Sequence, residues 1–108
     1  MLLASLITVL IFVRTDCPIA NRYAPELQRL DREFNSRGVT FRMVYPDPGE
    51  TEQSALKHVK EYGFPGKVLL DPSHEWVKRG RARTTPEAAV FTSDQRLLYH
   101  GRIDDRYV

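Results

Sequence analysis

The pattern of apolar and polar positions predicts a strand followed by a long amphipathic helix in the first third of the chain. Residues 2–13 carry no charge and are typical of a buried strand with a short apolar lead-in. Pro18 suits the first position of a helix, and Gly38 suits its end. Between these two residues, apolar side chains recur every three or four positions and form one face: Ile19, Tyr23, Leu27, Leu30 and Phe34. Pro25 falls inside this pattern and is expected to kink the helix.

The next segment predicts a strand parallel to the first. Residues 39–45 alternate and are rich in β-branched and aromatic side chains. A strand, a helix and a second strand in this order imply a right-handed crossover between parallel neighbours. Residues 51–62 then predict a second helix, which Gly63 ends.

The remaining pattern predicts a short strand, a short helix and a hairpin. The strand covers residues 68–70, and the helix covers residues 75–79 with Trp76 as its core anchor. The hairpin pairs residues 88–92 with residues 97–100 across a polar turn. The overall order is therefore βαβ, an insertion, and then ββ.

Composition limits the class of protein. With 108 residues, 28% charged and 42% hydrophobic, the chain is expected to form one soluble domain over residues 1–108. Its 16 basic and 14 acidic residues are interspersed and give a formal charge of +2, which argues against a nucleic-acid partner. The uncharged run is shorter than the ~20 residues that span a bilayer, which argues against a membrane partner. The alternative interpretation of this run, a signal-peptide core, lacks a basic start and a cleavage site.

The single cysteine, Cys17, is the main candidate for chemistry. It lies where the first strand gives way to the helix, so its sulfur is expected to meet the positive end of the helix dipole and unpaired backbone N–H groups. Both favour the reactive thiolate. Arg14 and Arg22 would stabilise that anion further, whereas Asp16 would oppose it. The alternative is a small buried hydrophobic residue, as many lone cysteines are.

The histidines give weaker signals. His100 is interpreted either as a solvent-facing strand residue or as a general base, and the sequence leaves both open. His58 and His74 show no ligand spacing with Cys17 or with each other, so neither a metal nor a cofactor site is predicted.

Three spaced features together resemble a known family. They are Cys17 at a strand-to-helix junction, Pro25 eight residues later, and the Thr85-Pro86 pair just before the hairpin. With the segments 12–25 and 101–107, they are similar to bacterial redoxin-domain proteins of the AhpC/TSA and thiol-disulfide-isomerase-like group, in the thioredoxin-like superfamily. The resemblance implies a thioredoxin-like α/β sandwich with a central mixed sheet flanked by helices, truncated at both ends.

The resemblance also assigns roles to individual positions. Cys17 matches the attacking cysteine and is followed by Pro18 of the motif. Pro86 matches a cis-proline that faces the cysteine across a substrate groove, and Thr85 matches the residue whose backbone pairs with an extended substrate. Gly101 matches the loop on the other side of the groove, which would bring His100 near the thiol.

The departures from the family pattern restrict the reaction. Ala20 stands where dithiol members carry the resolving cysteine, and Ile11 stands where thioredoxins carry a buried aspartate. Arg14 and Leu10 replace the Thr or Ser and the Pro of the peroxiredoxin pattern. With one cysteine no internal disulfide can form, and copper chaperones, which need two, are excluded.

Two functions remain open at this point. The first is a monothiol redoxin whose Cys17 attacks a protein disulfide, a small disulfide or a peroxide and is resolved by an external thiol. The second is a redox-inactive module that binds a peptide beside Pro86. Because the chain starts in the central strand and lacks the closing helix of its relatives, an uncovered apolar face and self-association as a homodimer are expected.

Overall fold

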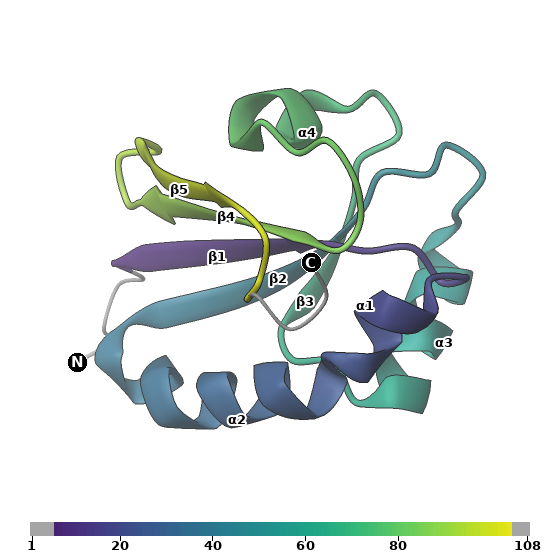
Figure 1. Cartoon of the computed structure of the whole chain (residues 1–108), viewed down its shortest axis with the longest axis horizontal. Coiled ribbons are helices and arrows are strands. Elements are labelled where there is room, and N and C mark those ends of the chain that lie inside the picture. The colour runs from purple at the N-terminus through teal and green to yellow at the C-terminus, as the bar shows by residue number, and fades with distance from the viewer. Residues whose placement is uncertain (1–5, 105–108) are drawn as a thin grey trace.

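The computed structural model describes residues 6–104, which form one mixed sheet covered by helices on both faces (Figure 1). The strand order is β3-β2-β1-β4-β5. Strands β1, β2 and β3 are parallel, and β4 and β5 run antiparallel to their neighbours. The predicted order of βαβ, insertion and hairpin is confirmed. The elements are β1 (Ile7–Phe12), α1 (Pro18–Arg22), α2 (Ala24–Phe34), β2 (Val39–Tyr45), α3 (Glu52–Tyr62), β3 (Lys67–Leu70), α4 (Glu75–Gly80), β4 (Glu87–Thr92) and β5 (Leu97–Gly101).

The first helix differs from its prediction because it is broken and not merely kinked. α1 ends at Arg22, and α2 begins at Ala24, so the break at Tyr23 lies two residues before Pro25. A proline ring cannot donate to the carbonyl four residues earlier and collides with it. Continuous helical pairing between Pro25 and Asn21 is therefore impossible, and the chain interrupts the helix upstream of the proline.

The end of this segment also differs in detail. α2 stops at Phe34, and a 3₁₀ turn, Asn35–Arg37, follows it. Gly38 then adopts the left-handed conformation that was predicted, with φ of 88°. The next helix, α3, ends at the C-cap residue Gly63, as predicted, and begins one residue later than predicted, with Thr51 as its N-cap.

Alternation along the central strand divides the core in two. Ile11 and Val13 pack on the face covered by α1, α2 and α3, whereas Leu10 and Phe12 pack on the face covered by α4 (Figure 1). Cys17 contacts the first of these cores. Because β1 is buried on both faces, its run of apolar residues is continuous, as is typical of a central parallel strand.

The short helix α4 is held by a buried carboxylate. Asp71 is 2% exposed, and its two oxygens accept the backbone N–H groups of Trp76 and Val77 at 3.1 and 3.0 Å. Trp76 packs edge-on against Phe91, so its predicted role as the core anchor of this helix is confirmed. Within residues 6–104, no helix is long and apolar enough to cross a membrane.

Candidate active site around Cys17

Cys17 lies between the carboxyl end of β1 and the first turn of α1. Its backbone is extended, with φ of −101° and ψ of 104°, and Pro18 begins the helix. The carbonyl of Cys17 accepts the N–H of Asn21 at 3.1 Å, and its own N–H donates to the carbonyl of Arg14 at 3.3 Å. The residue is partly exposed. The chain thus presents the sulfur at the start of a helix, at the edge of the sheet where parallel strands end.

The loop before β4 forms the other wall of the site. The Thr85–Pro86 peptide bond is cis, as predicted. The Sγ atom of Cys17 lies 3.8 Å from the carbonyl oxygen of Thr85, to which the thiol donates. Two segments far apart in the sequence therefore meet at the sulfur, and both Thr85 and Pro86 are half-buried.

A buried glutamate that the sequence did not single out holds this loop. Glu87 is 5% exposed, and its Oε1 atom accepts the backbone N–H groups of Arg83 at 2.7 Å and Thr84 at 3.4 Å. Both N–H groups immediately precede Thr85. Buried polar groups are costly unless paired, so this carboxyl group fixes the loop in one conformation.

The Arg14 guanidinium lies in a pair of ion pairs near the start of α1. It contacts Asp16 at 3.2 Å and Asp47 at 3.5 Å. The hydrogen bond that Arg14 donates to Asp16 chiefly raises the pKa of Arg14, with smaller electrostatic contributions from Asp47 and Cys17. Arg22, in contrast, is the last residue of α1, at the opposite end of that helix from Cys17.

His100 and Cys17 are not brought together, which differs from what the resemblance implies. His100 is exposed and pairs with Ala89 across the β4–β5 ladder, and Gly101 pairs with Ala88. Residues directly opposite in a ladder point to the same face. Ala89 packs on the α4 side and Ala88 on the side of Cys17, so the register directs His100 away from the thiol. Gly101, with φ of 140°, pairs with Ala88 near the start of β4. Pro86 directly precedes that strand.

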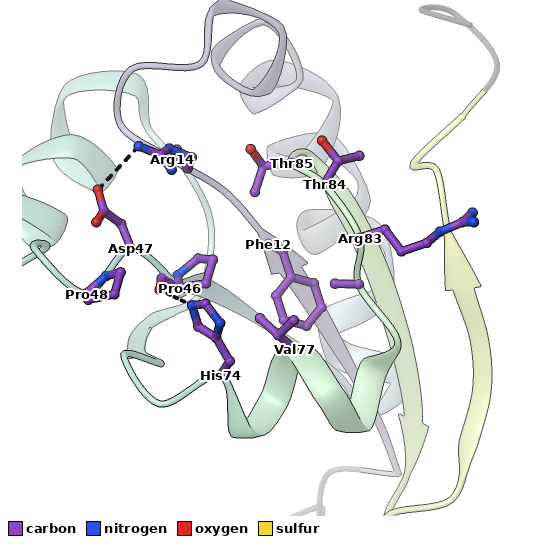
Figure 2. A pocket seen from close by; sticks show the side chains of 11 residues that line it. Phe12, Arg14, Pro46, Asp47, Pro48, His74, Val77, Arg83, Thr84 and Thr85 are labelled. Atoms are coloured by element: carbon purple, nitrogen blue, oxygen red, sulfur yellow. Dashed lines mark hydrogen bonds and ion pairs between the residues drawn. The ribbon is translucent and has the colours of Figure 1, made fainter.

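A cavity of about 360 Å³ lies on the α4 side of the sheet, beside the loop that ends at Thr85 (Figure 2). Arg14 and Thr85, which both contact Cys17, also line it, although Cys17 itself does not. Phe12 and Val77 give it an apolar floor, and His74 donates from Nε2 to the carbonyl of Pro46 at its edge. The other lining residues are Asp47, Pro48, Ala82, Arg83 and Thr84.

Comparison with known proteins decides the family. The AhpC/TSA family model matches residues 3–100. The chain belongs to the AhpC/TSA family. No curated protein matches it. Within residues 6–104, this redoxin has no group of three His, Cys, Asp or Glu side chains that could hold a metal ion.

Solved structures agree on the fold of this redoxin. An uncharacterized conserved protein from Geobacillus kaustophilus is 28% identical, with a TM-score of 0.80, and the match covers 94% of this chain and 57% of that one. A hypothetical protein from Sinorhizobium meliloti 1021 is 25% identical, with a TM-score of 0.81, and the match covers 95% and 59%. The redoxin thus spans less than two thirds of either protein's length.

A more distant structure supports the fold alone. A thiol-disulfide isomerase from Corynebacterium glutamicum is 20% identical, with a TM-score of 0.71 over 94% of the redoxin and 75% of its own chain. The mixed sheet, its flanking helices and these likenesses establish a thioredoxin-like α/β sandwich, as the sequence predicted.

The redoxin also contains a polar cluster that sequence reasoning missed. His58, on α3, is 5% exposed and hydrogen-bonds to Tyr45 on β2 and Asn21 on α1. The available signal was positional, because His58 shares the helical face of Ala55, Val59 and Tyr62. A histidine on an otherwise apolar face needs buried hydrogen-bond partners. The two partners, Tyr45 and Asn21, both lie within elements that the sequence predicted.

Proposed function

We propose that this AhpC/TSA-family protein is a thiol-disulfide oxidoreductase that acts through a single nucleophilic cysteine, Cys17, and is resolved by an external thiol. The observation that carries the proposal is the 3.8 Å approach of the Cys17 sulfur to the Thr85 carbonyl, beside cis-Pro86. A partly exposed cysteine at this position is accessible to a substrate disulfide. The backbone at Thr85 and the neighbouring Pro18 and Gly101 are the groups we propose to contact that substrate.

The reaction is three successive thiol-disulfide exchanges. The Cys17 thiolate attacks one sulfur of the substrate disulfide, the substrate S–S bond breaks, and the leaving sulfur departs as a thiolate that takes a proton from solvent. An external thiolate then attacks the Cys17 sulfur and releases the reduced substrate. A second external thiolate attacks the external sulfur of the new mixed disulfide. The bond to Cys17 breaks, Cys17 is released as a thiolate, and the two external thiols leave as a disulfide. Ala20 cannot replace these external thiols, because it has no sulfur.

The cavity beside Thr85 suits the part of the substrate that does not react. Its apolar floor and its polar rim of Arg14 and Asp47 would accept a side chain or a small organic group next to the disulfide. The substrate that we propose is thus a disulfide-containing protein or small molecule. The reductant that we propose is an external thiol. Self-association stays a prediction, which sedimentation velocity of the purified protein tests.

Trapping the mixed disulfide tests the proposal. We expect the folded protein, mixed with glutathione disulfide or a peptide disulfide at pH 7, to gain one adduct by mass, on Cys17, which added thiol removes. Cys17→Ser should form no adduct and show no turnover with either disulfide or with hydrogen peroxide, because it lacks the nucleophile. A parallel reaction with peroxide distinguishes the peroxidase alternative.

Two outcomes would contradict the proposal. One is a reaction rate of the folded protein no higher than that of a short unstructured peptide containing Cys-Pro-Ile-Ala. The other is reducing activity that survives in Cys17→Ser. Either result would favour the redox-inactive peptide-binding module, and urea unfolding of Cys17→Ser verifies that this variant is folded.

A further inference from the structure

A buried hydrogen-bonded chain joins the helix that follows Cys17 to the core of the molecule. Nε2 of His58 lies 2.7 Å from Oδ1 of Asn21, and Nδ1 lies 2.8 Å from the hydroxyl of Tyr45. The three residues come from α3, α1 and β2. The rings of Tyr62 and Phe64 pack against the imidazole, with centroids 5.1 and 5.2 Å away. Both ring nitrogens of His58 are therefore satisfied inside an aromatic surrounding.

The helix α1 is short and depends on contacts with the rest of the fold. It has five residues, of which only Ala20 is buried, and no side chain caps its N-terminus. It is also separated from α2 by the break at Tyr23. A five-residue helix is far below the length at which helical hydrogen bonds sustain a helix alone. The hydrogen bond from His58 to Asn21 is one such contact, and it joins α1 to α3 one turn beyond Cys17.

The hydrogen bonds among Asn21, His58 and Tyr45 fit a neutral imidazole. The Asn21 oxygen can only accept, so Nε2 carries the proton, and Nδ1 is left to accept from Tyr45. Burial raises the pKa of Tyr45 and keeps its hydroxyl available as that donor. Burial likewise lowers the pKa of His58, and the carboxylates of Glu50 and Glu61 oppose this change without reversing it. Protonation would force the Tyr45 hydroxyl to turn and would place a cation among the aromatic rings.

We infer that Asn21 and His58 are positioning residues for Cys17. His58 holds α1 through the hydrogen bond that its Nε2–H group donates to Asn21, so that the sulfur faces Thr85, and loss of that donor or of its acceptor releases the hold. The inference rests on the proposed function, because it treats Cys17 as the reactive thiol. A displacement of a reacting group by about 1 Å can cost as much as a hundredfold in rate, so a loosened α1 slows the attack.

The test compares the rate of Cys17 alkylation by iodoacetamide between pH 5 and 9, a readout that needs no substrate disulfide. His58→Phe keeps a ring but loses both hydrogen bonds. We expect Cys17 in this folded variant to be alkylated at least about threefold more slowly than in the wild type. Asn21→Asp keeps the acceptor and stabilises protonated His58. It should move the His58 titration, followed by NMR, to higher pH and preserve the bond to α1, whereas Asn21→Leu, which removes the acceptor, should slow alkylation as much as His58→Phe does. Lys57→Gln, on the exposed side of α3, is the control and should behave as the wild type.

A double variant tests whether the new carboxylate acts through His58. In Asn21→Asp combined with His58→Phe, the charge near Cys17 remains but the donor is gone, so alkylation should be slower than in Asn21→Asp alone. The inference is overturned if folded His58→Phe or folded Asn21→Leu reacts at the wild-type rate. Should His58→Phe not fold, Asn21→Leu decides the matter. A wild-type Cys17 no faster than the unstructured peptide would instead refute the proposed function, since the inference concerns only differences between variants.

Discussion

At the scale of single residues, the site depends on polar side chains that never touch a substrate. Glu87 is the clearest case, because its carboxyl group binds the loop that ends at Thr85 and is shielded from water. Cys17 supplies the sulfur, but the carbonyl that faces it is placed by this glutamate. Surface ion pairs such as Arg14 with Asp16 are expected to contribute little, because water screens both charges.

Replacing Glu87 should therefore affect both stability and chemistry. We expect Glu87→Ala to lower the free energy of unfolding by about 3 kcal/mol, because the backbone N–H groups of Arg83 and Thr84 lose their charged acceptor. Glu87→Gln keeps one oxygen and should cost about half as much. Urea unfolding measures both values. The exposed Glu75→Ala is the control, expected within about 0.5 kcal/mol of wild type, and a Glu87→Ala change equally small would show that Glu87 does not anchor the loop.

The residues of the site were predictable to different degrees from the sequence. Cys17 and Pro86 carry local signals, namely a lone thiol before a helix and a proline before a hairpin, and both lie as expected. Glu87 carries none, and His58 carries only its position on an apolar helix face, because their roles depend on partners from other elements. The resemblance misplaced His100 for a related reason, since the pairing register that turns it away from the thiol is a property of two strands together. The other interpretation of His100, a solvent-facing strand residue, agrees with its exposure.

At the scale of elements, the short helix α1 determines what the cysteine can do. Ala20 lies one turn after Cys17 and is 1% exposed, packed against the core. Its place in the sequence is the one that holds a second thiol in dithiol relatives. Pro25 interrupts the helix at Tyr23, two residues upstream of the proline itself. The apolar periodicity of residues 19–34 is continuous and could not reveal this break.

The substitution Ala20→Cys should convert the site into a reversible dithiol. Residues three apart on a helix lie on one face, so the new sulfur is expected to reach Cys17. Thiol counting by mass after mild oxidation should find no free thiol in the variant, and a reductant should restore two. The wild-type protein, treated identically, should give only a sulfenic acid, a mixed disulfide or a dimer through Cys17. Two free thiols retained by an oxidised, folded Ala20→Cys protein would contradict the proposed geometry.

At the scale of the whole molecule, the sheet follows from rules that the sequence makes accessible. Alternation and crossover handedness predicted the parallel β1–β2 pair and the antiparallel hairpin, and Figure 1 shows both in one sheet. What the pattern could not supply is how the two faces are divided. Leu10 and Ile11 are neighbours in an unbroken apolar run, and only the fold assigns them to separate cores.

The burial of His58 makes the stability of the whole fold depend on pH. Its pKa is lowered in the folded protein, so the unfolded chain takes up a proton first as the pH falls below the ordinary value of ~6.5. The contribution of neutral His58 is present above that pH and is lost progressively as the pH falls toward the folded value, by at most about 1.4 kcal/mol per pH unit. Urea unfolding at a series of pH values from 7.5 to 5 should show this decline in the wild type and a flatter profile in His58→Phe. His100→Gln, at an exposed position, should keep the wild-type slope. If His58→Phe declines as steeply as the wild type, other groups account for the acid sensitivity and His58 is not held neutral in the core.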